Sequence, residues 1–134
     1  MESAYSEEWE NIQIVHHTLG QLIEACELIL EWNQGVNSEE DYLCTPAGLK
    51  TMAATCMLIE SIGEGIKKID KKMPGFLVKH RPEIEWRQIK AIRDHIAHGY
   101  MEIDATPIVE SVKNDVSPLL EALKYLKQVI YDEY

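Results

Sequence analysis

The sequence has no long hydrophobic run, because no apolar stretch approaches the ~18 residues that a membrane-spanning helix needs. The first ten residues, MESAYSEEWE, are acidic and lack the apolar stretch of a signal peptide. We therefore expect neither a membrane span nor a secretion signal. The chain has 134 residues, of which 46% are hydrophobic and 27% are charged. This balance predicts one globular domain over residues 1–134.

Cysteine is scarce as well. The three cysteines, Cys26, Cys44 and Cys56, show no CxxC spacing, which predicts free thiols in a cytoplasmic protein. Cys26 and Cys56 fall on apolar helix faces and are expected in the core. His95 and His98 lack a third and a fourth ligand at a useful spacing. The sequence therefore predicts no metal site and no cofactor.

Positive charge is nearly absent from residues 1–66, which hold twelve acids and one lysine. Residues 67–93 hold nine bases and three acids, a net charge of +6 within a chain of net charge −10. The overall charge argues against a general nucleic-acid coat. The basic segment can attract a phosphate backbone, or it can be a solvated lysine-rich loop. Both interpretations stay open.

Apolar residues at alternating steps of three and four predict a first helix over residues 6–34, with Ser6 as its N-cap. The predicted apolar face comprises Trp9, Ile12, His16, Leu19, Ile23, Cys26 and Leu30. The stretch NQGVNSEED then predicts a loop. A second helix is expected to begin at Thr45-Pro46, with Leu49 on its apolar face, and to end at MPGF, residues 73–76. Gly63 and Gly65, inside this helix, indicate a close approach to another helix.

A third helix is expected after Pro82, ending near Gly99. A fourth should open at Thr106 and continue to residue 130, kinked or split by Pro118. No segment has a convincing strand pattern. The predicted fold is all-α, a four- to five-helix up-and-down bundle.

The stretch RDHIAHGY, residues 93–100, holds the most chemistry in the chain. Arg93 offers a planar fork of donors that matches the oxygens of a phosphate. His98 titrates near neutral pH and can act as a base or an acid. RNA carries its own nucleophile, the 2′-hydroxyl, so these two groups suffice for cleavage without a metal. Asp94 lies four residues before His98 and can orient its imidazole, and His95 faces either the core or a cleft.

Arg93 and His98 lie about 140° apart around an ideal helix. They share a site only if the helix ends before His98, or if two chains complete one cleft across a two-fold axis. Ordinary roles remain open for each residue. Arg93 can be a surface ion-pair partner, His98 can stabilise a helix C-terminus, and Tyr100 can be a surface tyrosine.

Three blocks carry a family resemblance: IESIGEGIKKID at 59–70, IEWRQIKAIRDHIAHGYMEID at 84–104 and VSPLLEAL at 116–123. In order and separation they resemble the HepT-like branch of the HEPN superfamily, over residues ~10–130. The resemblance implies a HEPN-like helical bundle that forms a homodimer and builds one cleft from two Arg-x4-His-x-Tyr motifs. It also implies a metal-independent endoribonuclease that acts as a toxin.

In that family the partner is an MntA-like nucleotidyltransferase antitoxin, which transfers adenylate to the motif tyrosine. Position by position, Arg93 and His98 match the catalytic pair, Tyr100 matches the adenylylated tyrosine, and Asp94 and His95 are supporting residues. Gly99 stands where these proteins often carry aspartate. Two alternatives stay open. The chain can be a non-catalytic HEPN module that binds RNA, a nucleotide or a nucleotidyltransferase, or a purely structural dimerisation bundle.

Overall fold

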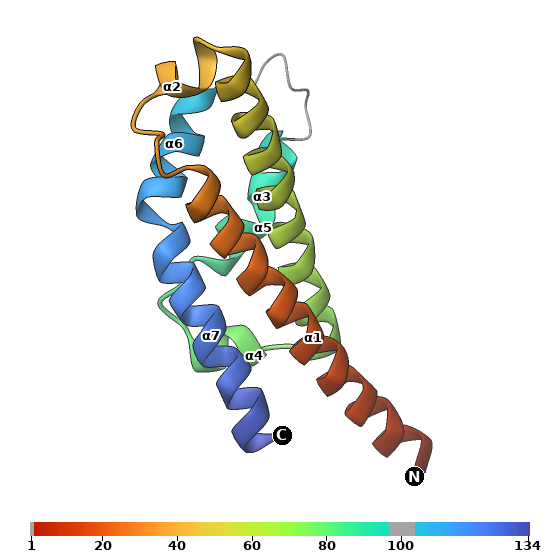
Figure 1. The fold of residues 1–134 in the computed structure, drawn as a ribbon. Helices are drawn as coiled ribbons and strands as arrows, with labels where there is room; N and C mark the ends of the chain where they lie inside the picture. The colour runs from red at the N-terminus through yellow and green to blue at the C-terminus, as the bar shows by residue number, and fades with distance from the viewer. Residues whose placement is uncertain (1, 97–103) are drawn as a thin grey trace.

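The structure is a computed structural model that describes residues 2–96 and 104–134. Within these residues the chain forms helices and no strand: α1 (Glu2–Trp32), α2 (Glu39–Leu43), α3 (Pro46–Lys72), α4 (Phe76–His80), α5 (Trp86–Ile96), α6 (Ala105–Asn114) and α7 (Val116–Glu133). The long helices α1, α3 and α5 alternate in direction, and α6 and α7 run back antiparallel to α5 (Figure 1). The all-α, up-and-down prediction is confirmed. The short helices α2 and α4 cap opposite ends of the bundle.

The start of α1 differs from the prediction. The helix begins at Glu2, so Ser6 lies inside it and the predicted N-cap is wrong. Trp9 is 54% exposed, although the repeat placed it on the core face. In Figure 1 the first turns of α1 extend beyond the end of α3 and diverge from α7, so this part of the helix is covered less than the rest. Further along, Ile12, Leu19 and Cys26 are buried as predicted.

The ends of α3 agree with the sequence prediction. The Thr45 hydroxyl accepts a hydrogen bond from the Gly48 amide at 3.0 Å, and Pro46 occupies the first helical position. Gly75 adopts a left-handed φ of 81° just after the helix ends, which allows the chain to turn into α4. Leu49 is an exception to the predicted apolar face, since it is 45% exposed.

The predicted close approach of helices occurs at Gly65. A β-carbon added there would lie 2.5 Å from Leu22 Cδ2 of α1. The absence of a side chain therefore lets α1 and α3 pack closely, and α3 also packs against α5 on another side. The core lies between these helices and α7, and its fully buried members include Val15, Leu19, Ile66, Leu123 and Leu126.

Pro118 splits the last helical repeat, as predicted. Helix α6 ends at Asn114 and α7 begins at Val116, so the break falls at Asp115. A proline has no amide hydrogen, and its ring clashes with the carbonyl four residues earlier, here that of Asn114. The fourth helix opens at Ala105, where the Asp104 carboxylate caps it by accepting a hydrogen bond from the Thr106 amide at 3.1 Å.

Candidate functional site

The predicted site residues lie at the C-terminal end of α5. Arg93, Asp94 and His95 belong to the last turns of this helix, although their side chains are outside the described part of the structure. His98 and Tyr100 also lie outside the described residues, as does the predicted helix end near Gly99. The backbone of α5 is helical through Ile96, three residues beyond Arg93.

The start of α5 is anchored to the linker after α4, which is itself joined to α7. Trp86 is 4% exposed, and its indole Nε1 donates a hydrogen bond to the Arg81 carbonyl at 2.9 Å. The Arg81 guanidinium nitrogens lie 2.9 Å from a Glu83 carboxylate oxygen and 3.3 Å from one of Glu121 on α7. Its Cζ atom lies 5.4 Å from the ring centre of Tyr125. The hydrogen bonds to Glu83 and Glu121 raise the pKa of Arg81. These contacts hold the first turn of α5 to the linker, and the linker to α7.

The middle of α5 is joined to α3. Lys90 Nζ lies 2.6 Å from Asp70 Oδ2, and both side chains are about one-third exposed. A partly exposed pair of this kind contributes roughly 1 kcal/mol or less to stability. Together with the buried Trp86, this pair places the last turn of α5 at the end of the bundle occupied by α2 and the start of α3 (Figure 1).

The chain is anchored again immediately after the motif. Asp104 caps α6, and Ala105 is 3% exposed. The Thr106 hydroxyl donates a hydrogen bond to the Glu39 carboxylate of α2, and the Lys113 ammonium donates one to the Asn37 carbonyl. Residues 97–103 therefore connect two helices, each of which is joined to the rest of the bundle.

A buried polar network holds α2 in place. The Tyr42 hydroxyl donates to Asn33 Oδ1 at 2.5 Å, and Asn33 Nδ2 donates to the Thr55 hydroxyl at 2.9 Å. All three side chains are buried, and burial raises the pKa of Tyr42. The network joins the end of α1, α2 and α3. It was not predicted, because these three polar residues are far apart in the sequence and none carries a distinctive local pattern.

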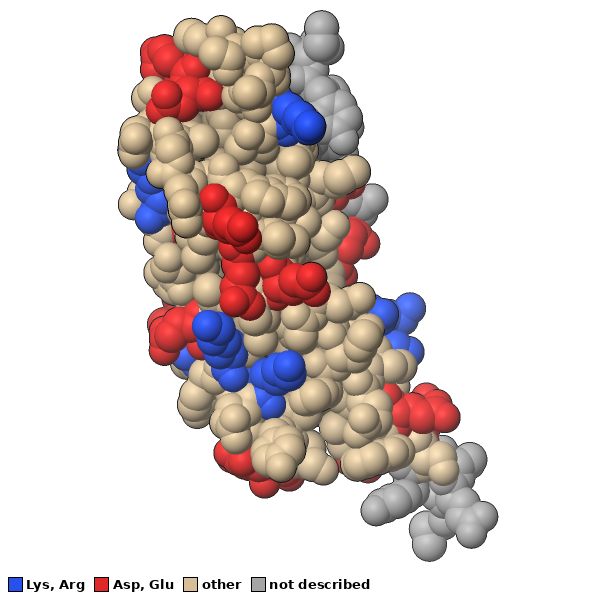
Figure 2. Space-filling view, viewed as in Figure 1, with Lys and Arg blue, Asp and Glu red and all other residues tan. Residues whose placement is uncertain are grey.

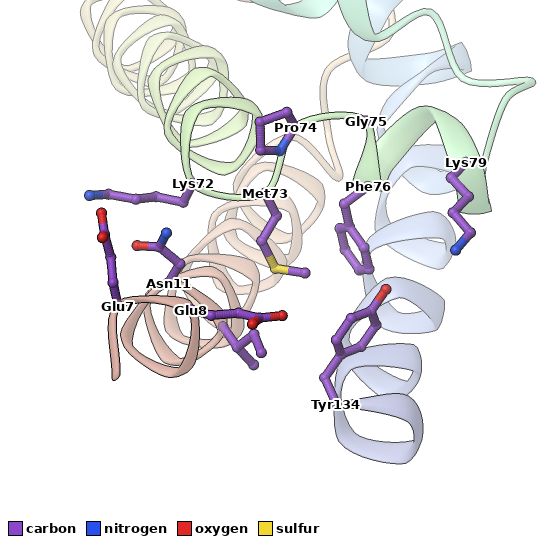
Figure 3. A pocket seen from close by; sticks show the side chains of 11 residues that line it. Glu7, Glu8, Asn11, Lys72, Met73, Pro74, Gly75, Phe76, Lys79 and Tyr134 are labelled. Atoms are coloured by element: carbon purple, nitrogen blue, oxygen red, sulfur yellow. The ribbon is translucent and has the colours of Figure 1, made fainter. Parts of the chain in front are cut away.

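Three clefts lined by described residues lie away from the last turn of α5. The basal cleft, about 650 Å³, is at the opposite end of the bundle, between the start of α1, the α3–α4 turn and the end of α7. Figure 3 shows Met73 at its centre, with Phe76 and Tyr134 on one wall and Glu8 reaching in from α1. The Phe76 and Tyr134 rings meet edge to face, with centroids 6.0 Å apart. Glu7 and Lys72 lie on the other wall, so the cleft has no dominant charge.

Two further hollows border α3 and α5. A groove of about 660 Å³ between α1 and α3 has Leu22, Ala25 and Gly65 in its lining. A slot of about 340 Å³ beside α5 is lined mainly by apolar residues, five of them isoleucines, with Glu83, Glu85 and Asp115 among its polar residues. In the described residues no three His, Cys, Asp or Glu side chains gather closely enough to hold a metal ion.

The cysteines and the remaining histidines occupy ordinary positions. Cys26, Cys44 and Cys56 are free thiols. Burial raises the pKa of Cys26 to about 12 and that of Cys56 to about 11, which agrees with their predicted core positions. His16 is half-buried and His17 is exposed on α1. No helix in the described part of the chain combines the length and the apolar character needed to cross a bilayer.

Comparisons with known proteins identify the family to which this chain belongs. The family model described as Ribonuclease HepT-like matches residues 22–126. The "Probable ribonuclease HepT" of Thermococcus cleftensis is 33% identical over 110 residues, covering 82% of this chain and 93% of that protein. A protein of Caldanaerobacter subterraneus subsp. tengcongensis, named as a candidate RNase, is 26% identical over 110 residues, covering 82% of this chain and 91% of its own. No solved structure matches the chain. The chain therefore belongs to the ribonuclease HepT-like family of the HEPN superfamily.

Proposed function

We propose that this protein is a metal-independent endoribonuclease toxin whose active site is Arg93 and His98. The observation that carries the proposal is the family match over residues 22–126, which includes both positions. The names of the two relatives, both ribonucleases, support RNA as the substrate. The anchoring of α5 and α6 on either side of residues 97–103 supports a site built on a rigid frame.

The proposed reaction needs only these two residues and the RNA. The His98 imidazole removes the proton of a 2′-hydroxyl, and the resulting oxygen attacks the adjacent phosphorus. The bond from phosphorus to the 5′-oxygen breaks, and that oxygen takes up a proton from water or from the His98 imidazolium as it leaves. Arg93 stabilises the negative charge that accumulates on the phosphate oxygens. The products are a 2′,3′-cyclic phosphate and a 5′-hydroxyl end. Asp94 and His95 support the imidazole.

The central test measures cleavage of total RNA with and without a chelator and identifies the new ends. Wild-type protein is expected to cleave in EDTA and to leave cyclic phosphate ends. Arg93→Ala and His98→Ala should each reduce cleavage by about a hundredfold or more. His17→Ala is the matched control, because this histidine is exposed on α1. Equal activity in the His98→Ala and wild-type proteins would refute the assignment.

The 140° separation of Arg93 and His98 on an ideal helix supports a cleft shared by two chains of a homodimer. Mixing the Arg93→Ala and His98→Ala proteins provides a test. If each site takes its arginine from one chain and its histidine from the other, half of the sites in a mixed dimer are intact and activity returns. If both residues come from the same chain, the mixture stays inactive.

Regulation is proposed to act on Tyr100, two residues from His98. An MntA-like nucleotidyltransferase antitoxin would transfer AMP from ATP, forming a bond between the tyrosine oxygen and phosphorus and releasing pyrophosphate. The added bulk and negative charge would repel the RNA phosphate. Incubation with such an enzyme and ATP should add one AMP per chain and abolish cleavage, and Tyr100→Phe should stay active and unmodified.

The second candidate is a non-catalytic HEPN module that binds RNA, a nucleotide or a nucleotidyltransferase. The net charge of −10 favours it, because an acidic protein binds RNA weakly outside a dedicated site. Measurable RNA affinity with no cleavage products, in protein that mass spectrometry shows to be unmodified, would select this function over the first.

A further inference from the structure

The outer face of the last turns of α3 is basic. Four lysines, Lys67, Lys68, Lys71 and Lys72, occur within six residues, and Lys68 and Lys71 are exposed. Lys67 lies 3.8 Å from Glu64, one turn earlier, and its side chain is 41% exposed. Figure 2 shows basic side chains projecting from the right-hand edge of the molecule, where the lower half of α3 runs in Figure 1.

This face continues onto the helix that carries the motif. The 2.6 Å ion pair between Lys90 and Asp70 places the middle of α5 beside the last turns of α3. Arg87 lies one turn before Lys90 and is exposed. The basic strip, defined as Lys67, Lys68, Lys71 and Arg87, therefore spans two adjacent helices.

Helix stabilisation explains only part of the strip. Lys71 lies in the last turn of α3, where the helix dipole favours a cation. Arg87 lies in the first turn of α5, where the dipole disfavours a cation. Among the described residues, Lys68, Lys71 and Arg87 have no acidic partner within 4 Å, whereas Lys67 and Lys90 each have one. Three unpaired cations in an acidic protein, one of them at an unfavourable helix position, indicate an anionic ligand.

We propose that the basic strip binds the sugar-phosphate backbone of single-stranded RNA next to the cleavage site. This inference rests on the proposed function, and it adds a second contact that determines which substrates bind. Arg87 and Arg93 are six residues apart, about 9 Å along the axis of α5. That distance spans no more than about three phosphates at the ~3.4 Å axial spacing of a stacked strand, and fewer in an extended single strand. An RNA held at the motif therefore needs only a few more nucleotides to reach the strip.

The binding test uses a 20-nucleotide fluorescent RNA with 2′-O-methyl groups, which lacks the attacking hydroxyl and cannot be cleaved. The variant is Lys68→Glu/Lys71→Glu. The matched control is Lys124→Glu/Lys127→Glu on α7, which has the same residue spacing and the same change in net charge. Thermal unfolding of both variants verifies that they are folded, and fluorescence anisotropy measures affinity over a range of salt concentrations.

We expect the dissociation constant of the strip variant for RNA to rise about tenfold or more. The salt slope, which is the slope of log affinity against log salt concentration, should become shallower by about 1.4, or about 0.7 for each of two lost phosphate contacts. The control should keep the wild-type salt slope. Equal weakening in the two variants, unchanged binding in the strip variant, or no RNA binding by the wild type would overturn the proposal.

A cleavage assay separates this inference from the proposed function. On a dinucleotide, which is too short to reach the strip, the strip variant should turn over like the wild type. On the 20-nucleotide RNA with free 2′-hydroxyls its KM should rise while kcat is retained. If the wild type cleaves neither substrate, the proposed function fails, and the anisotropy result still decides whether the strip binds RNA.

Discussion

Substituting Gly48 with alanine should destabilise the protein far more than the same change at Gly65. A β-carbon at Gly48 would lie 2.2 Å from the Asp41 carbonyl oxygen and 2.8 Å from that of Tyr42. Both atoms belong to the backbone of α2, which cannot rotate away as a side chain can. At Gly65 the nearest atom is the tip of the Leu22 side chain, at 2.5 Å, and a rotamer change can move it.

The expected magnitude follows from two opposing effects. Overpacking costs about 1–3 kcal/mol, and the upper end applies at Gly48 because α2 must move by about 1 Å to restore ordinary contacts of about 3.3 Å. Alanine recovers up to about 1 kcal/mol of helix propensity. The net loss for Gly48→Ala is about 2 kcal/mol, or about 8 °C in Tm. Gly65→Ala should stay within about 1 kcal/mol of wild type.

Urea denaturation followed by far-UV circular dichroism measures both free energies of unfolding. Displacing α2 should also disturb its hydrogen bond from Thr106, at the start of α6. Gly48→Ala should therefore lower RNA cleavage even at temperatures where it is fully folded. A Gly48→Ala protein as stable as wild type, or one no less stable than Gly65→Ala, would refute the packing of α2 against α3 described above.

Three further outcomes are expected. Tyr42→Phe should lose about 1–3 kcal/mol in urea denaturation, because Asn33 Oδ1 is left buried without its donor; an unchanged midpoint would contradict the network. A thiol-reactive disulfide reagent should modify one cysteine rapidly in the native protein, the exposed Cys44, and all three in denaturant, since burial raises the pKa of Cys26 and Cys56. Backbone hydrogen bonds from Asn37 and Ser38 lower the pKa of Asp41 below its ordinary value of 3.8. The stability contributed by this lowered pKa is present above pH 3.8 and is lost as the pH falls through the folded-state value. The Tm difference between wild type and Asp41→Asn should therefore shrink in acid, and a constant difference would argue against these bonds.

The sequence predicted the long helices well because their apolar repeats and end signals agree. Thr45 and Pro46 mark the start of α3, and Pro118 marks the split between α6 and α7. Prediction from the sequence was wrong where the exposure of a residue depends on its contacts with other helices. Trp9 continues the apolar repeat of α1 but is 54% exposed. Helices α2 and α4 each have five residues, which is too short for a helical period to be recognised.

The candidate site was predictable only as a local motif. The spacing of Arg93 and His98 follows from the sequence, and α5 carries the arginine as expected. What supports the motif was not predictable, because Glu39 and Thr106 are 67 residues apart and Lys90 and Asp70 belong to different helices. Such pairs form only after the bundle topology has brought their helices together.

The antiparallel packing of α7 against α1 has a consequence for biosynthesis. Helix α1 is made before α7, which packs along one side of it and follows it by more than eighty residues. Domains fold as units during translation, so a nascent chain that has not yet released α7 from the ribosome keeps that side of α1 uncovered. A bundle closed in this way completes its fold only after α7 has left the ribosome, so any activity that depends on the folded bundle waits for that step.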